Sequence, residues 1–167
     1  MLKKIVLAVM LALPLGAMAQ TKFGHMNSQE IITVMPEFTK AQADLDAMSK
    51  QYQTEMQRTQ EEFTKKYQEF LAQADSLPKN IAERRQKELQ DMSQRQEQFQ
   101  QEAYQSMQKA QQDAMTPIYQ KLETAVQAVG KAEGVIYIFD MARTPLAYIG
   151  AESIDLTAKI KAQLGIK

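Results

Sequence analysis

The sequence predicts a mostly helical protein in which a long antiparallel helical hairpin is inserted into a small α/β body. Three observations predict this fold. The 167 residues include only 6 Gly and 5 Pro, which is few for a fold built on many turns. Two long stretches repeat apolar residues every three or four positions, which is the helical period. A shorter stretch near the C-terminus is rich in β-branched and aromatic residues, as strands are.

Charge and composition narrow the function classes. The chain carries 20 basic and 20 acidic residues, and this balance disfavours an electrostatic grip on nucleic acid. Contact with a membrane stays open, although the charge does not indicate it. The sequence has no Cys and a single His, His25, so a disulfide framework and a thiolate metal site are ruled out. We therefore expect no cofactor, no metal and no enzymatic activity.

The N-terminal segment has the three-part layout of a secretory signal peptide. Two Lys residues precede an apolar run over residues 5–13, and Ala17-Met18-Ala19 then places small residues where signal peptidase reads them. An uncleaved membrane anchor is the alternative, but roughly 20 apolar residues are needed to span a bilayer. We expect cleavage before Gln20, removal of residues 1–19, and localisation in a bacterial periplasm.

The mature chain is expected to start with a strand and a short helix. Residues 21–26 form a short mixed segment that we interpret as a strand. Asn27 stands three residues before Glu30, which is the spacing of a capping box and predicts a helix start. Met35-Pro36 interrupts this helix, and a long helix is expected to begin near Glu37.

Two helices of similar length are then predicted to fold back on each other as a coiled-coil arm over residues 37–129. Apolar residues recur from Phe38 to Leu77 in steps of three and four, close to the coiled-coil repeat. Pro78 breaks this pattern, and a second pattern runs from Ile81 to Val129. Gly134 is a better C-terminal stop for it than the Gly four residues earlier.

The C-terminal part is predicted to complete the body, which comprises residues 20–36 and 130–167. Val135–Phe139 is apolar on both faces, so this strand must be covered on both sides. Leu146–Ile149 is predicted to be a second strand, and a short C-terminal helix follows.

The body is expected to associate with sister chains. It holds only about 55 residues, a size at which one core is hard to stabilise alone. Burying its apolar strand against copies of the same chain is the simplest solution. The candidate interface residues are Phe23, Val135, Ile136, Tyr137, Ile138, Phe139, Leu146 and Tyr148.

Residues that could carry chemistry have simpler structural interpretations. His25 lies on a predicted strand with no marked partner, so packing is a more common role for it than catalysis. Asp140 and Asp155 flank the predicted sheet, where a turn or a helix cap is the more common role. No nucleophile and base stand out together in the sequence.

The arm, in contrast, is rich in Met and aromatic residues, which adaptable binding surfaces use heavily. Their spacing also fits a simple seam between the two helices, and both roles can coexist because a two-helix seam covers only part of each helix. The candidate contact residues for a bound protein are Met48, Tyr52, Met56, Phe63, Phe70, Leu71, Met92, Phe99, Tyr104 and Met107.

The whole mature chain resembles the Skp/OmpH family of periplasmic chaperones. The resemblance is carried by the order of several segments around the Gln-rich hairpin. They are Phe23-Gly24-His25-Met26-Asn27-Ser28-Gln29-Glu30-Ile31, Pro117-Ile118, Gly134-Val135-Ile136-Tyr137-Ile138-Phe139-Asp140 and Asp155-Leu156-Thr157.

This resemblance implies a homotrimer in which three helical arms enclose a cavity. It implies an ATP-independent holdase that binds unfolded outer-membrane β-barrel proteins there, before their membrane insertion. The first arm helix is net acidic in this sequence, whereas familiar family members are strongly basic. We therefore assign no lipopolysaccharide-binding site to this chain from the resemblance.

The rival interpretation is a periplasmic coiled-coil structural or adaptor protein. A spacer of that kind is expected to have a seam saturated with Leu and Ile, whereas this one is loose and contains Met. Under the chaperone interpretation, Pro36 and Pro117 are the candidate hinges at the base of the arm. Pro117 lies inside the second helix, where it removes a backbone hydrogen bond and predicts a kink.

Overall fold

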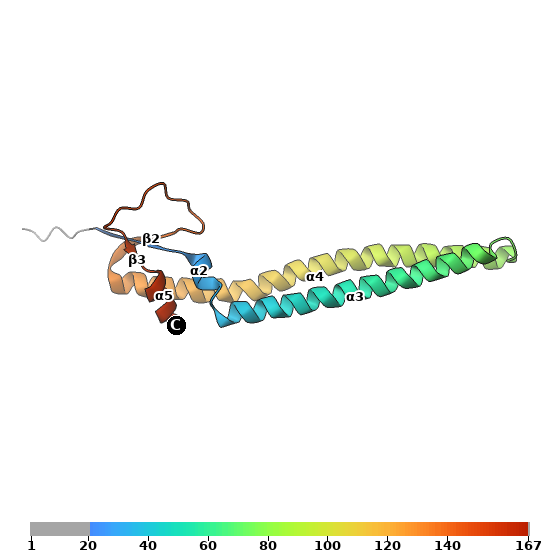
Figure 1. Cartoon of the computed structure of the whole chain (residues 1–167), viewed down its shortest axis with the longest axis horizontal. Helices are drawn as coiled ribbons and strands as arrows, with labels where there is room; N and C mark the ends of the chain where they lie inside the picture. Colours follow the sequence, from blue (N-terminus) through green and yellow to red (C-terminus); the bar gives the residue numbers. More distant parts are fainter. Residues whose placement is uncertain (1–20, 167) are drawn as a thin grey trace, which may run out of the picture. The chain divides into compact units, whose positions relative to one another are not determined.

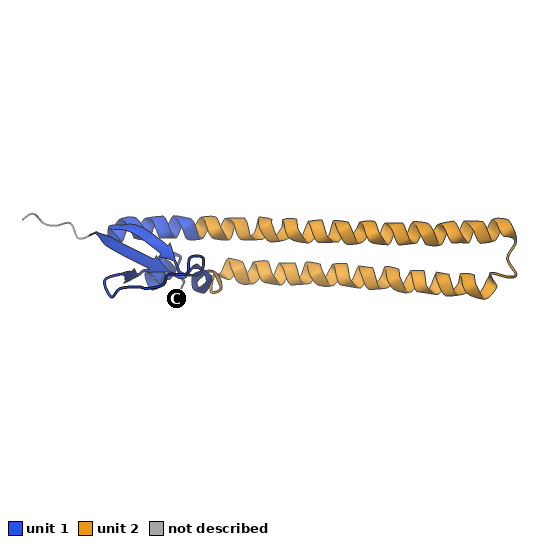
Figure 2. Ribbon diagram, turned by 90° about the horizontal axis from the view of Figure 1, so that it is seen from above, with its two compact units in different colours: residues 1–31, 122–167 blue, residues 32–121 orange. Residues whose placement is uncertain are grey.

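A computed structural model describes residues 21–166. Two compact units are present, one formed by residues 1–31 and 122–167 as far as these are described, the other by residues 32–121 (Figure 2). We call them the body unit and the hairpin unit. The predicted signal peptide, residues 1–19, lies outside the described residues. The predicted limits of body and arm, at residues 36 and 130, stay predictions.

The order of elements confirms a mostly helical chain with a small sheet. The elements are β1 (Lys22–Met26), α2 (Ser28–Ile32), α3 (Pro36–Gln73), α4 (Lys79–Glu133), β2 (Val135–Asp140), β3 (Ile154–Asp155) and α5 (Thr157–Gln163) (Figure 1).

The predicted capping of the first short helix is confirmed. The Oδ1 atom of Asn27 accepts a hydrogen bond from the backbone N–H of Glu30 at 3.1 Å, which satisfies one of the N–H groups left over at a helix start. The next helix, α3, begins at Pro36 itself. Proline suits this first position because its fixed φ is helical and its missing N–H would have had no partner.

The hairpin unit confirms the predicted pair of long helices. Helix α3 has 38 residues and α4 has 55, and they run side by side in opposite directions within this unit (Figure 2). The carbonyl of Pro78 accepts hydrogen bonds from the N–H groups of Ile81 and Ala82 at 2.9 and 3.0 Å. The chain therefore enters α4 directly after the proline that ends the turn.

Helix α4 continues through Gly130 and ends where Gly134 was predicted to stop it. Gly134 has a φ of 65°, a left-handed conformation that glycine adopts without a Cβ clash. Pro117 lies inside the helix, and the Thr116 hydroxyl donates to the Gln112 carbonyl at 2.7 Å. Such bonding often accompanies a bend. The kink at Pro117 and the hinges at Pro36 and Pro117 stay predictions.

The sheet has three strands in the order β2-β1-β3, and both pairs are parallel. The predicted second strand at Leu146–Ile149 is wrong, because residues 141–153 form a loop and β3 follows it. Two features explain the difference. The backbone turns directly after β2, where the Asp140 carbonyl accepts from the N–H of Thr144 at 2.9 Å. Pro145 then removes a donor that a ladder would use.

One face of the sheet packs on helices of the body unit. A Cβ atom built on Gly24 would lie 2.7 Å from Cδ1 of Leu156, and one on Gly130 of α4 would lie 3.1 Å from Cδ1 of Ile138. The side chains that fill this core are Met26, Ile31, Leu122, Ala125, Val129, Leu156 and Ile160, all of them buried. The core thus lies between the sheet and the helices α2, α4 and α5.

The two aspartates beside the sheet have the structural roles that their positions predicted. The Asp140 carboxylate accepts from the N–H groups of Ser28 and Ala142 at 3.0 and 3.1 Å. The Asp155 carboxylate accepts at 2.9 Å from the N–H of Thr157, the first residue of α5, and so satisfies one of the N–H groups at this helix start. Hydrogen bonds from Thr157 are the main cause that lowers the pKa of Asp155.

Replacing Gly24 by Ala should destabilise the body, because the new methyl group would overlap Leu156, which has no exposed surface. Overpacking of this kind costs about 1–3 kcal/mol of unfolding free energy, measurable by urea denaturation. Gly150→Ala is the matched control, since its Cβ would lie 3.6 Å from the Tyr148 ring in ordinary contact. Equal stability of the two variants would contradict this packing.

Replacing Asp155 by Ala should cost about 1 kcal/mol of unfolding free energy at pH 7, a typical net value for one hydrogen bond. Since folding lowers the pKa of this carboxyl group, its contribution is complete above the ordinary value near 4 and is lost as the pH falls through the lower folded value. The difference from wild type should therefore shrink below about pH 4. Asp44→Ala, on the exposed face of α3, should show no such convergence in denaturation curves.

Candidate functional site

The seam between α3 and α4 is thinly packed. In the described hairpin unit, the buried apolar residues on these two helices are Ala41, Leu89, Ala103 and Ile118. Two of the four are alanines, whereas a well-packed coiled coil buries Leu or Ile at every turn. Most of the larger apolar side chains along the seam therefore keep part of their surface in water.

The ten predicted contact residues follow this pattern. Leu71 and Tyr104 are clearly exposed, at 55% and 65% of their surface. The other eight are half-buried, being Met48, Tyr52, Met56, Phe63, Phe70, Met92, Phe99 and Met107. The hairpin thus presents an extended apolar surface that its own two helices do not cover.

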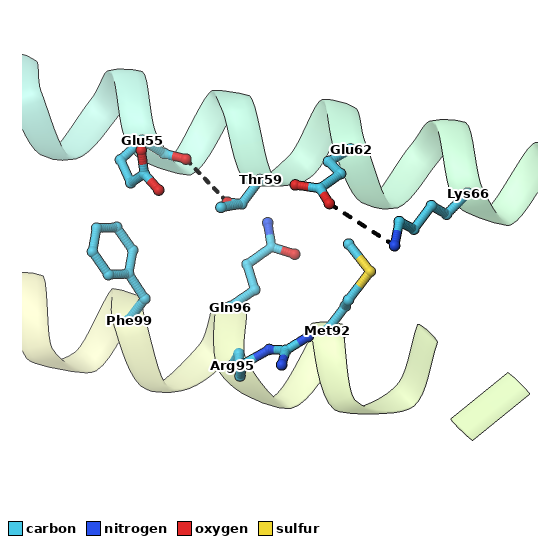
Figure 3. Close-up of a pocket in the computed structure, with 8 residues that line it drawn as sticks. All are labelled: Glu55, Thr59, Glu62, Lys66, Met92, Arg95, Gln96 and Phe99. Carbon is cyan, nitrogen blue, oxygen red and sulfur yellow. Dashed lines mark hydrogen bonds and ion pairs between the residues drawn. The ribbon is translucent and has the colours of Figure 1, made fainter. Parts of the chain in front are cut away.

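Hollows open along this seam. The one that we call the seam pocket has a volume of about 410 Å³ and is lined by Glu55, Thr59, Glu62, Lys66, Met92, Arg95, Gln96 and Phe99 (Figure 3). A second hollow, of about 400 Å³, is lined in part by Leu45, Tyr104 and Met107. The structure therefore brings Met92 and Phe99 together, and Tyr104 and Met107, at separate places.

Polar contacts also join the two helices. Lys66 pairs with Glu88, and Lys121 pairs with Glu37. The hydrogen bond from each lysine is the main cause that lowers the pKa of its glutamate. Exposed ion pairs contribute little stability, so we interpret these contacts as fixing the register of the hairpin more than its strength.

Tyr67 was missed as a contact candidate. It is 45% exposed, and its ring stacks on Phe63 with centroids 6.1 Å apart and planes within 5°. A signal for it was present in the sequence, because Phe63, Tyr67 and Leu71 stand four residues apart and so share one face of the helix.

The sheet of the body unit has an uncovered side. Phe23 stacks on Tyr137 with ring centroids 6.3 Å apart, and Tyr137 lies at the same distance from Phe139. These three residues, which we call the aromatic face, are 41%, 61% and 38% exposed. The loop 141–153 arches over this side (Figure 1) and leaves a groove of about 680 Å³.

The remaining interface candidates are divided between the two sides of the sheet. Val135 and Ile138 are half-buried and face Gly130 of α4. Leu146 lines the groove with Tyr148, which is 84% exposed. Ile136 is 58% exposed on β2, a strand at the edge of the sheet. Exposed apolar side chains beside an open strand edge are typical of a surface that another chain covers.

His25 has a partner that the sequence did not reveal. Its Nδ1 atom lies 2.9 Å from the Ser153 hydroxyl oxygen. Asp155, opposite His25 on the neighbouring strand, directs its carboxylate to the N–H of Thr157 instead.

Residues 21–166 contain neither a cluster of metal-binding side chains nor a helix that could span a membrane. No group of three or more His, Asp or Glu side chains in this part of the chain is arranged to hold a metal ion. Within the same residues, the long helices are too polar to cross a membrane.

Comparisons with known proteins agree with this geometry. The sequence model described as "Outer membrane protein (OmpH-like)" matches residues 22–164. A comparison with curated proteins gave no match. The fold is similar to the crystal structure of a protein from Caulobacter crescentus CB15 that is described as an OmpH-like outer membrane chaperone. The TM-score is 0.74 at 19% identity, over 86% of this chain and 83% of that chain.

At 19% identity the structural likeness shows the fold, and it is the family match that establishes kinship, because it spans nearly all of the described residues. The mostly helical architecture and the resemblance stated from the sequence are both confirmed. The chain belongs to the OmpH-like outer membrane protein family.

Proposed function

We propose that the protein is an ATP-independent periplasmic holdase that binds unfolded outer-membrane β-barrel proteins and prevents their aggregation before membrane insertion. Membership of the OmpH-like family supports a chaperone role rather than an enzymatic one. The observation that carries the proposal is the thin seam, which leaves Met and aromatic side chains of α3 and α4 half-exposed along the hairpin.

Such a surface suits an unfolded β-barrel protein. Its strands alternate apolar and polar side chains and have unpaired edges, so they aggregate in water. Met side chains are unbranched and adapt to many shapes. Many weak contacts of this kind hold a client without fixing its conformation, and several hairpins acting together raise the net affinity by avidity.

Self-association of the chain would bring several hairpins together around one client. In our proposal, body units of three chains cover one another's aromatic faces and strand edges, and the three arms enclose the client. The exposed Phe23, Tyr137 and Phe139 support this step. Release needs no nucleotide, because insertion of the client into the membrane is itself strongly downhill. The predicted signal peptide supports a periplasmic location, where ATP is absent.

A structural or adaptor role is the second candidate. It would use the hairpin as a spacer or as a docking rod for one folded partner. The polar contacts that join α3 to α4, such as Lys66 with Glu88, fit a defined register. The half-exposed Met and aromatic residues fit it less well, because a rigid rod has no use for an open seam.

Holdase activity should appear when a urea-unfolded outer-membrane barrel is diluted into buffer containing the processed protein. Light scattering should fall in the presence of a several-fold molar excess of chaperone. The double variant Leu71→Gln/Tyr104→Gln removes two exposed apolar side chains. It should raise the chaperone concentration needed for half-maximal suppression of scattering by about fivefold, because each substitution reduces the apolar area that contacts the client.

The matched control is Gln68→Ala/Gln105→Ala, which changes exposed polar residues on the same two helices and should behave as wild type. If the wild-type protein suppresses no scattering at any tested excess, the holdase proposal is wrong and the spacer role is favoured.

Self-association should be visible in the native mass. Sedimentation equilibrium of the processed wild-type chain should give three times the monomer mass. Tyr137→Glu places a carboxylate on the aromatic face, where its burial between chains is unfavourable, and should give a monomer. Tyr104→Glu changes a tyrosine of similar exposure on the hairpin and should keep the trimer mass. A wild-type monomer at micromolar concentration contradicts this assembly.

A further inference from the structure

The apolar pattern of α3 shifts by one residue in the middle of the hairpin. Met48 and Tyr52 continue a coiled-coil frame whose next positions, in steps of three and four, are residues 55, 59, 62 and 66. These positions carry Glu55, Thr59, Glu62 and Lys66, while the apolar residues Met56, Phe63 and Phe70 each stand one residue after a position of this frame. One residue corresponds to about 100° around a helix.

On α4 the frame continues without this shift. Leu89, Met92, Phe99 and Ala103 keep the same steps, with Gln96 as the polar member. Met92 and Phe99 therefore line a seam pocket whose α3 side is polar (Figure 3), although Phe99 also packs on Tyr52 just before the shift. In the terms of coiled-coil packing, α3 supplies no apolar knob for this hole, and the polar Gln96 of α4 projects into it between Met92 and Phe99 (Figure 3).

Several polar groups around the pocket are already engaged. Glu55 pairs with Arg58 at 2.6 Å, and Glu62 lies 3.7 Å from Arg58 and 4.0 Å from Lys66. The Thr59 hydroxyl donates to the carbonyl of Glu55 at 3.1 Å. Two acidic and two basic side chains line the pocket, so the rim is balanced and suits an uncharged occupant.

The apolar part of the lining suits an aromatic occupant. The Met92 sulfur can contact the edge of a ring, and Phe99, which already packs on Tyr52 at a tilt of 58° with centroids 5.7 Å apart, can pack on a second ring. The Gln96 amide donates its N–H to Gln60 at 2.8 Å, which leaves its carbonyl able to accept from a Trp N–H or a Tyr O–H. The volume of about 410 Å³ is at the lower end of ligand-site sizes.

We propose that the seam pocket receives one aromatic side chain of the bound, unfolded β-barrel segment, acting as a knob supplied by the client. This inference rests on the proposed holdase function and names the client feature that the hairpin selects. Membrane β-barrels carry girdles of aromatic residues at both ends of their apolar band, so such side chains recur along a client chain.

Filling the hole from within tests this inference. Thr59→Leu places an apolar side chain of the chaperone on the α3 side of the pocket, opposite Gln96 (Figure 3). It should raise the melting temperature by about 2–4 °C and at the same time weaken binding of a strand peptide about 5- to 10-fold, the loss expected for one aromatic contact. The probe is a twelve-residue barrel-strand peptide with a single Trp. The chaperone has no Trp. A blue shift of Trp fluorescence therefore reports only the environment of the peptide.

The matched control is Thr64→Leu. Thr64 is exposed on the same helix, and its hydroxyl also donates to the backbone one turn earlier, at 2.9 Å. It should leave the peptide dissociation constant within twofold of wild type. Equal affinities of the two variants would overturn the proposal.

A second measurement uses the wild-type chain alone. A peptide in which the Trp is replaced by Leu should compete about tenfold more weakly, since Leu forms no ring contacts with Met92 and Phe99. Equal competition would also overturn the proposal. If the whole client is still protected from aggregation in that case, the holdase function stands and only the pocket assignment fails; if wild type protects nothing, the proposed function itself fails.

Discussion

Apolar surface that one chain cannot bury by itself is the constraint on which the rest of this structure depends. In the body unit, Leu156 and Ile160 fill the core on one side of the sheet and have no exposed surface. The other side has only a loop to cover Phe23, Tyr137 and Phe139, and a three-stranded sheet is too small to curl around them. Water therefore reaches rings that contribute stabilisation only when another chain covers them.

The hairpin meets the same constraint in a different way. Its seam alternates small residues such as Ala41 and Ala103, which are buried, with larger ones that remain half-exposed. The frame shift after Tyr52 places Thr59 and Lys66 where Leu would close the seam. A coiled coil with Leu at these positions would be more stable, but it would present little apolar surface to a partner. The polar residues at these positions lower hairpin stability and leave neighbouring apolar side chains partly exposed, as the binding surface that we propose requires.

Much of this fold could be predicted from the sequence, because its determinants are local. The helical period, the Asn27 cap and the left-handed Gly134 depend on neighbouring residues alone. The third strand could not be predicted, since Ile154–Asp155 is only two residues long and pairs because the edge of β1 is available. The apolar run Leu146–Ile149 lines a groove instead, a role that its composition does not distinguish from a strand. Likewise, spacing identified Met92 and Phe99 but not the hollow between them, which depends on the side chains that α3 places opposite.

If the seam binds clients as we propose, the hairpin must keep one register while clients bind and leave. Two ion pairs join α3 and α4 near opposite ends of the hairpin, Lys121 with Glu37 and Lys66 with Glu88, and the Gln96–Gln60 hydrogen bond joins them between these pairs. Each contact is exposed and weak on its own. A shift of one residue would break all three together, however, and would also separate Tyr52 from Phe99. The register is thus fixed by exposed polar contacts, which leaves the apolar side chains between them free for the client contacts that we propose.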